Sequence, residues 1–185
     1  MSYIIFAAFL VLADQLFKIW IIRNIPLGEE IALIPAVMGL TNVRNEGAAF
    51  SLFTGLQLPI IILTILVCLA ILVAFCLGRP RVRSQRFALA LVLGGAIGNL
   101  LDRLLRGYVV DMFKTLFVDF AVFNIADCCI VAGGILFVVS VLFFSPYEKE
   151  LKAIPSSEGE KEAVLEQLKA YKPEQEQKHD PADPG

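Results

Sequence analysis

The chain has 185 residues, of which 57 % are hydrophobic, and a formal net charge of -2. Its mean hydropathy of +0.72 is far above what a soluble domain of this length needs for its core, so the composition excludes an ordinary water-soluble protein. Four apolar runs are long enough to cross a bilayer of about 30 Å at about 1.5 Å per helical residue. They cover residues 3–22, 58–77, 87–105 and 123–144. We therefore expect an all-α membrane protein with four transmembrane helices.

The first apolar run has an alternative interpretation as a cleavable signal peptide. Its purely apolar part, residues 4–13, has the length of a signal h-region. No Lys or Arg precedes it, no small-x-small cleavage site follows it, and hydrophobicity resumes from Ile19 to Ile22. These flanks favour a retained helix. Within it, Asp14 and Lys18 have i,i+4 spacing with the acid first, which favours an ion pair between them.

The connection between the first and second helices, residues 23–57, contains the segments IALIP and GLTNVRN. Both combine residues typical of strands with turn formers, so they predict a small β-sheet outside the membrane.

The connection between the second and third helices, GRPRVRSQR, fixes the orientation of the bundle. It contains four arginines and no acidic residue, and short loops rich in Lys and Arg stay in the cytoplasm. We therefore expect both termini in the cytoplasm. The two longer connections, residues 23–57 and 106–122, then face outward, and the small sheet is extracytoplasmic.

The third helix has a polar face near its C-terminal end. Asp102 and Arg106 have the i,i+4 spacing of an ion pair, and Asn99 and Arg103 lie on the same face. Such a face usually forms hydrogen bonds with neighbouring helices and loops. The same helix holds three glycines at a spacing that permits close helix approach, namely Gly94, Gly95 and Gly98.

In this orientation the ionisable side chains of the helices gather near the outer surface. Such side chains are costly in hydrocarbon, so they face the bundle interior, find partners or do chemistry. Asp111, in the second outer connection, has no obvious partner in the sequence. Asp127 stands near the start of the fourth helix, where an alternative interpretation makes it a helix-start carboxylate with Asn124 as the N-cap.

Asp111 and Asp127 are both expected at the outer edge of the membrane, where they could converge. Two close carboxylates share a proton and present one acid and one base at neutral pH. That pair supports peptide hydrolysis by an aspartic mechanism, in which the ionised carboxylate takes a proton from water and the protonated one polarises the carbonyl.

Two rival functions stay open. A small transporter or proton channel could use Asp14, Asp102, Asp111 and Asp127 as a relay, but relays usually extend through the membrane, and the inner half here is nearly free of ionisable groups. A non-catalytic assembly factor could instead bind a partner helix with the polar cluster. Loss of function on removal of either carboxylate would separate an enzyme from such a factor.

The remaining polar features carry no further chemistry. The four cysteines, expected as buried packing residues, lack the spacing of a metal or redox pair, and the single histidine, His179, lies in the tail. No metal or other cofactor is expected. We expect residues 1–147 to form the membrane body. Residues 148–185, with six Lys against ten Asp and Glu, should form a charged, disordered cytoplasmic tail.

Five short segments in order make the chain resemble the bacterial lipoprotein signal peptidase family, the type II signal peptidases, which are aspartic proteases of the membrane. They are DQLFK, NEGAAFS, GGAIGNLLDR, GYVVD and FNIAD, and they span residues 14–127. The resemblance implies that Asp111 and Asp127 are the catalytic dyad. It also implies that seven residues shape or support the site: Asp14, Lys18, Asn45, Asn99, Arg103, Asn124 and Ala126.

The resemblance further implies the substrate and the location. The substrate would be a prolipoprotein with a diacylglyceryl group on its lipobox cysteine, cut just before that cysteine. The enzyme would work without cofactor or nucleic acid, among membrane lipids. A four-helix body with its own buried polar cluster is expected to act as a monomer. It would lie in the bacterial cytoplasmic (inner) membrane with its active site on the extracytoplasmic side.

Overall fold

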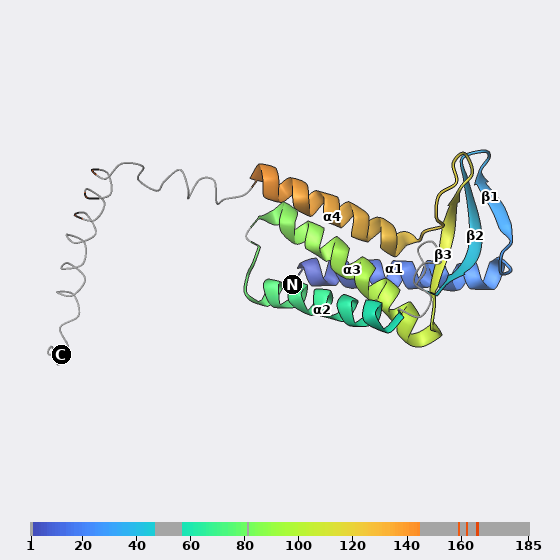
Figure 1. The fold of residues 1–185 in the computed structure, drawn as a ribbon, viewed down its shortest axis with the longest axis horizontal. Coiled ribbons are helices and arrows are strands. Elements are labelled where there is room, and N and C mark those ends of the chain that lie inside the picture. The colour runs from blue at the N-terminus through green and yellow to red at the C-terminus, as the bar shows by residue number, and fades with distance from the viewer. Residues whose placement is uncertain are drawn as a thin grey trace. The chain divides into compact units, whose positions relative to one another are not determined.

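A computed structural model describes residues 2–46, 57–80 and 82–144, and three residues of the tail, Gly159, Glu162 and Glu166. Its elements are, in order, α1 (Ser2–Asn24), β1 (Glu30–Ile34), β2 (Met38–Asn45), α2 (Gln57–Cys76), α3 (Arg83–Arg106), β3 (Val109–Thr115) and α4 (Ile125–Phe144). The three strands lie together at one end of the four helices (Figure 1). The expected boundary at residue 147 and most of the expected tail lie outside the described residues.

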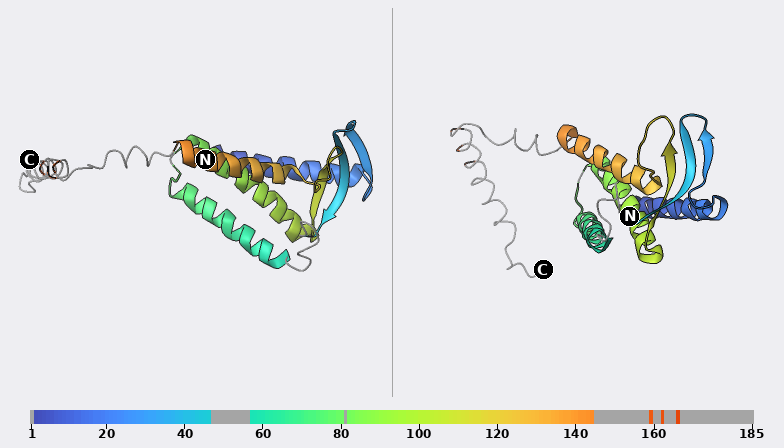
Figure 2. Two further views of the ribbon diagram at one scale, coloured as in Figure 1. Left: turned by 45° about the horizontal axis from the view of Figure 1, so that its top comes forward. Right: turned by 45° about the vertical axis from the view of Figure 1, so that its right-hand side comes forward.

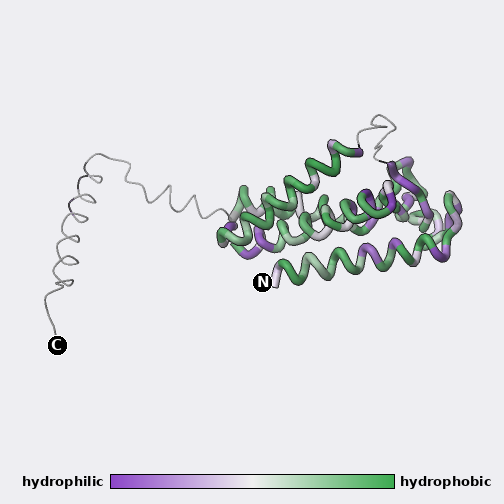
Figure 3. Tube along the Cα trace, turned by 90° about the horizontal axis from the view of Figure 1, so that it is seen from below, coloured by the Kyte–Doolittle hydropathy of each residue, from purple (hydrophilic) through white to green (hydrophobic). Residues whose placement is uncertain are grey.

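All four helices are long and apolar enough to cross a membrane, and along most of their length they are hydrophobic, whereas hydrophilic residues gather at the sheet and at the adjacent helix ends (Figure 3). α3 is central, because it packs against α1, α2 and α4. In the most apolar 18-residue stretch of α3, 50 % of the residues are buried inside the protein, compared with 11 % in α2. Of the described elements only α3 packs against α2 (Figure 2).

Glycines allow the close approach of α3 to its neighbours. A Cβ atom added at Gly95 would lie 2.3 Å from the carbonyl oxygen of Ala126 in α4, and one added at Gly98 would lie 2.8 Å from a carboxylate oxygen of Asp14 in α1. Both distances are shorter than any side chain tolerates. The predicted small-residue packing is thus confirmed, and it brings the polar residues of α1, α3 and α4 together.

The sheet has the order β1-β2-β3 with antiparallel neighbours. β1 and β2 correspond to the two segments predicted as strands. Residues 106–122, predicted as the connection to the fourth helix, also contain a strand that the sequence did not predict: residues 109–115 form β3 and pair with β2, Val43 opposite Asp111. Apolar side chains of β2 and β3 pack on the end of α1 in one buried cluster: Ile21, Ile25, Leu40, Val110 and Met112.

Candidate active site

The site begins with a buried ion cluster between α1 and α3. Lys18 Nζ lies 2.8 Å from Asp14 Oδ2 and 2.9 Å from Asp102 Oδ2, and all three side chains are at most 1 % exposed. Arg106 adds an ion pair to Asp102. The two predicted i,i+4 pairs are therefore confirmed. The bond from Lys18 to Asp102 joins them across the two helices, which sequence spacing did not indicate.

This cluster also holds elements that carry the candidate catalytic residues. Asp14 Oδ1 accepts a hydrogen bond of 3.1 Å from the backbone N–H of Ala126, in the first turn of α4. Asp102 Oδ2 accepts one of 3.1 Å from the backbone N–H of Val110, which precedes Asp111 in β3. The ion cluster thereby fixes the start of α4 and the start of β3 relative to α1 and α3.

Gln15 is a member of the network that is absent from the site residues predicted from the sequence. Its side-chain amide donates to the carbonyl oxygen of Gly98 and to Asp102 Oδ1, both at 3.1 Å, and its Oε1 accepts from Arg106 at 3.1 Å. A polar side chain next to Asp14 inside a transmembrane helix was the available signal.

Asp111 lies in β3, 2 % exposed, and accepts two amide hydrogen bonds. Asn45 Nδ2 of β2 donates to Asp111 Oδ2 at 2.8 Å, and Asn124 Nδ2 donates to Asp111 Oδ1 at 2.6 Å. The sequence showed no partner for Asp111 because both partners are distant along the chain: Asn45 comes from the neighbouring strand and Asn124 from the residue before α4.

Asp127 lies in the first turn of α4. Its backbone N–H donates to Asn124 Oδ1 at 2.9 Å, and its Oδ2 accepts from the backbone N–H of Asn124 at 3.1 Å. This reciprocal pair is a capping box, so the predicted N-cap role of Asn124 is confirmed. Asn99 Nδ2 of α3 donates to Asp127 Oδ1 at 2.7 Å. Asn124 therefore contacts both aspartates, through its side chain and its backbone.

Lys18 sets the orientation of the Asn99 amide. Lys18 Nζ donates to Asn99 Oδ1 at 2.9 Å, and Asn124 Nδ2 donates to the same oxygen at 3.2 Å. With two donors on its oxygen, the Asn99 amide must point its nitrogen at Asp127. The ion cluster and the two aspartates thus belong to one continuous hydrogen-bond network.

Arg103 is a partly buried cation of α3 beside the two aspartates. Its guanidinium donates to the carbonyl oxygen of Asn99 at 3.3 Å, and its charge interacts with those of Asp127 and Asp111. Its Nε is buried and has no hydrogen-bond partner among the described residues.

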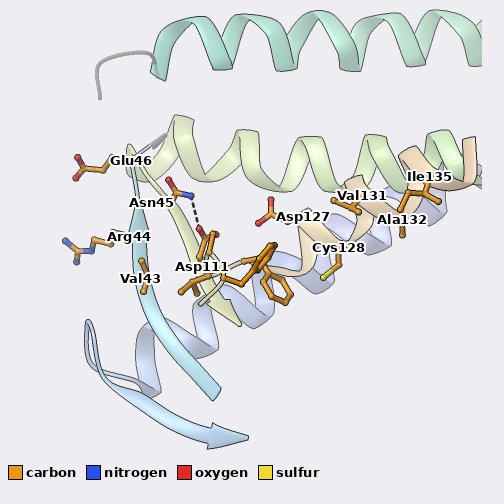
Figure 4. A pocket seen from close by; sticks show the side chains of 14 residues that line it. Val43, Arg44, Asn45, Glu46, Asp111, Asp127, Cys128, Val131, Ala132 and Ile135 are labelled. Carbon is orange, nitrogen blue, oxygen red and sulfur yellow. Dashed lines mark hydrogen bonds between the residues drawn. The ribbon is translucent and has the colours of Figure 1, made fainter. Parts of the chain in front are cut away.

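Asp111 and Asp127 line a single pocket of about 950 Å3 at the sheet end of the helices. In Figure 4 both carboxylates lie beside the pocket, between β2 and the start of α4, and Asn45 points at Asp111. One wall is apolar and comes from α4, and the opposite rim comes from β2. The lining residues are Val43, Arg44, Asn45, Glu46, Asp111, Phe120, Ala121, Val122, Phe123, Asp127, Cys128, Val131, Ala132 and Ile135.

Cys128 on the pocket wall corrects one expectation. The cysteines were interpreted as buried packing residues, which holds for Cys68 and Cys129, but Cys76 and Cys128 are exposed. Among residues 2–46, 57–80 and 82–144, no group of three or more His, Cys, Asp or Glu side chains could hold a metal ion.

Burial makes Asp111 easier to protonate. The pKa of Asp111 is raised from 3.8 to about 6, chiefly by burial and in smaller part by the nearby Asp127 carboxylate, against the hydrogen bonds from Asn45 and Asn124 and the charge of Lys18, which lower it. A carboxyl group of this kind can carry a proton near neutral pH and give it to a substrate.

The fold and the site define a multi-pass membrane protein with two aspartates on a pocket at one end of its helices. A family described as signal peptidase (SPase) II matches residues 6–143. The lipoprotein signal peptidase of Lactococcus lactis subsp. lactis (strain IL1403) is 41 % identical over 133 residues, 71 % of this chain and 87 % of that protein. That of Lactobacillus johnsonii (strain CNCM I-12250 / La1 / NCC 533) is 39 % identical over 145 residues, 77 % and 93 % of the two chains.

Solved structures agree with this assignment. A structure described as that of a bacterial membrane enzyme superimposes with a TM-score of 0.71 at 31 % identity, covering 85 % of this chain and 93 % of that one. A second superimposes with the same TM-score at 33 % identity, covering 77 % and 94 %. The chain belongs to the signal peptidase II family, and it is therefore a protease of the membrane.

Proposed function

We propose that Asp111 and Asp127 are the catalytic dyad of an aspartic endopeptidase that removes the signal peptide from diacylglyceryl-modified prolipoproteins. The observation that carries the proposal is that Asn124 contacts both carboxylates at the wall of a largely apolar pocket. Each of the four carboxylate oxygens accepts one N–H, from Asn45, Asn99 or Asn124, so both side chains are held in fixed orientations.

The two aspartates take different roles in the proposed reaction. Asp127 acts as the base and takes a proton from a water molecule, whose oxygen adds to the scissile carbonyl carbon. Asp111, whose pKa is raised, acts as the acid and gives its proton to the carbonyl oxygen. The resulting diol collapses when Asp127 passes its proton to the leaving amide nitrogen and Asp111 recovers one from a diol hydroxyl. The carbon–nitrogen bond breaks, and both aspartates return to their starting states.

The pocket suits a lipidated peptide. Its α4 wall, with Val131, Ala132 and Ile135, is apolar and extends from Asp127 along the helix. Its β2 rim carries the charged side chains of Arg44 and Glu46. An apolar wall beside a polar rim fits a substrate in which an acylated cysteine begins a hydrophilic mature segment. The cut falls just before that cysteine.

The arrangement in the membrane belongs to the same proposal. Two arginines between α2 and α3, Arg79 and Arg81, and two in the first turn of α3, Arg83 and Arg86, support a cytoplasmic location for that loop and both termini, with the site facing outward in the cytoplasmic membrane. The site is built by one chain, and the enzyme acts as a monomer among membrane lipids. Residues 1–147 form the peptidase body, and residues 148–185 form a cytoplasmic tail without a catalytic part.

The substrate assignment is tested by giving the purified, detergent-solubilised protein two forms of one prolipoprotein, with and without the diacylglyceryl group. We expect cleavage of the lipidated form alone, and mass spectrometry should find the modified cysteine as the new N-terminus. Equal cleavage of both forms, or a cut at another bond, would refute the assignment. A chain without either carboxyl group, Asp111→Asn/Asp127→Asn, supplies the blank.

The raised pKa of Asp111 predicts how cleavage depends on pH. Since Asp111 must carry a proton, kcat/KM should fall as the pH rises through the pKa of the free enzyme, about 6. Because the two aspartates titrate together, the pKa read from this profile belongs to the pair rather than to one residue. The hydrogen bond from Asn45 lowers the pKa of Asp111, so Asn45→Ala should move this alkaline limb to higher pH. If the alkaline fall of kcat/KM keeps its position in Asn45→Ala, the fall reports the titration of a group other than Asp111.

A further inference from the structure

One end of the sheet is attached to the helices and the other is free. β3 begins two residues after Gly107, the C-cap of α3. At the opposite end Ile34 pairs with Met38, and Met38 with Thr115. The backbone N–H of Leu116 donates to the carbonyl oxygen of Val37 at 3.0 Å, which joins the β1–β2 turn to the start of the β3–α4 connection. This free end is uppermost in Figure 1.

Large apolar side chains are exposed on and beside the free end. The exposed fraction is 71 % for Phe117, 61 % for Phe120 and 50 % for Leu33. In water each would leave a large apolar area solvated, at a cost of about 25 cal/mol per Å2. We call this group of exposed side chains the apolar lip: Leu33, Val37, Phe117, Val118 and Phe120.

The sheet is amphipathic, and its apolar face is the one toward α1. Ile31 is opposite Leu40, and Leu40 is opposite Phe113, so the three share a face. Phe113 stacks on Phe17 of α1 with ring centroids 5.9 Å apart. The other face carries an exposed ion pair, Lys114 Nζ to Glu30 Oε2 at 2.7 Å. One face therefore suits water and the other suits lipid.

The apolar face continues the surface that α1 presents to the membrane. Leu12, Leu16 and Trp20 are exposed along α1, and Trp20 stacks on Phe17 at 5.8 Å, which stacks in turn on Phe113. Trp is enriched where a transmembrane helix reaches the membrane–water interface. Trp20 thus indicates the level of the interface next to the sheet.

We propose that the apolar lip inserts into the lipid leaflet at the sheet end of the helices, so that the sheet is a second, interfacial membrane anchor. Interfacial elements of this type bury their apolar side chains about 5–10 Å deep at the boundary of headgroups and acyl chains. Phe120 belongs both to the lip and to the pocket wall. The inserted lip therefore gives an acyl chain a path from the leaflet into the pocket that does not cross water.

The depth of the lip can be measured by fluorescence, because Trp20 is the only tryptophan of the chain. In a Trp20→Phe background, Phe117→Trp and Val37→Trp each report on the free end from a different connection. In vesicles of phosphatidylcholine brominated near the carboxyl end of its chains, both should lose about half of their fluorescence, since insertion of about 5–10 Å brings the indole to the bromines. Aqueous iodide should quench them little.

Glu29→Trp in the same background is the matched control, because Glu29 is exposed next to β1 at the attached end of the sheet. It should be quenched by iodide and spared by the brominated lipid. Equal lipid quenching at Glu29 and at both lip positions would overturn the proposal, as would lip signals that iodide quenches. Protection of the lip from both quenchers would indicate a protein partner and also overturn it. Thermal unfolding checks that each variant is folded, and no readout depends on cleavage.

Discussion

Asp111→Asn and Asp127→Asn are each expected to remove cleavage of a diacylglyceryl prolipoprotein while the protein still inserts and accumulates. An asparagine has the shape of aspartate but can neither take the proton of water nor give one to the carbonyl. General acid–base catalysis contributes about 10²–10⁴-fold per group, so each variant should lose at least that factor in kcat. The measurement is single-turnover cleavage by purified protein, followed as a shift on a gel.

The matched control for both variants is Asp119→Asn. Asp119 is an exposed aspartate of the connection between β3 and α4 and does not line the pocket, so its variant should keep its activity. The double variant Asp111→Asn/Asp127→Asn should be no slower than the slower single variant, because residues that act as a unit are not additive. Turnover retained in either single variant would remove that residue from the dyad.

The membrane part of the fold follows from hydropathy because a transmembrane helix is a local property of about 20 residues. β1 and β2 were likewise visible as short segments of strand-forming residues. β3 was not predicted. Residues 109–115 form a short apolar segment interrupted by Asp111 and Lys114, which the sequence alone does not distinguish from a connection at the membrane edge. Its pairing with β2 joins residues distant in sequence, and such long-range contacts leave no periodic signal.

The site divides in the same way between local and long-range features. The pair Asp14 and Lys18 and the capping role of Asn124 depend on spacings of three or four residues, which sequence shows directly. The bond from Asn124 to Asp111 and the bond from Lys18 to Asn99 depend on tertiary packing. Sequence therefore predicts which residues are polar in the membrane, but not that one network connects them.

That network explains why the positions of the polar residues relative to the outer membrane surface, expected from the sequence, pointed to Asp111 and Asp127. Polar groups in a membrane must satisfy one another, so they collect where α1, α3 and α4 approach closely through Gly95 and Gly98. The ion cluster is the buried end of the network, and the two aspartates are the end that faces the pocket. Its inner part should govern stability, and its pocket end should govern chemistry.

Lys18→Met is the variant in which stability should fall most. It leaves Asp14 and Asp102, both at most 1 % exposed, with Arg106 as the remaining partner in the cluster. Breaking a buried ion pair by removing one partner costs about 3–5 kcal/mol. Asp14→Asn should cost less, because Lys18 keeps its ion pair with Asp102. Unfolding in mixed detergent micelles with increasing sodium dodecyl sulfate measures both differences.

Lys114→Met is the control for this prediction, because it makes the same Lys→Met change in an ion pair of similar length that is exposed instead of buried. Lys114 and Glu30 are 47 % and 34 % exposed, and pairs of that kind contribute about 0–1 kcal/mol. The expected order of destabilisation is Lys18→Met, then Asp14→Asn, then Lys114→Met. If Asp14→Asn proved as stable as the parent chain yet inactive, Asp14 would act in the chemistry rather than in holding α4. If Lys18→Met and Lys114→Met were equally stable, the buried cluster would not hold the helices together.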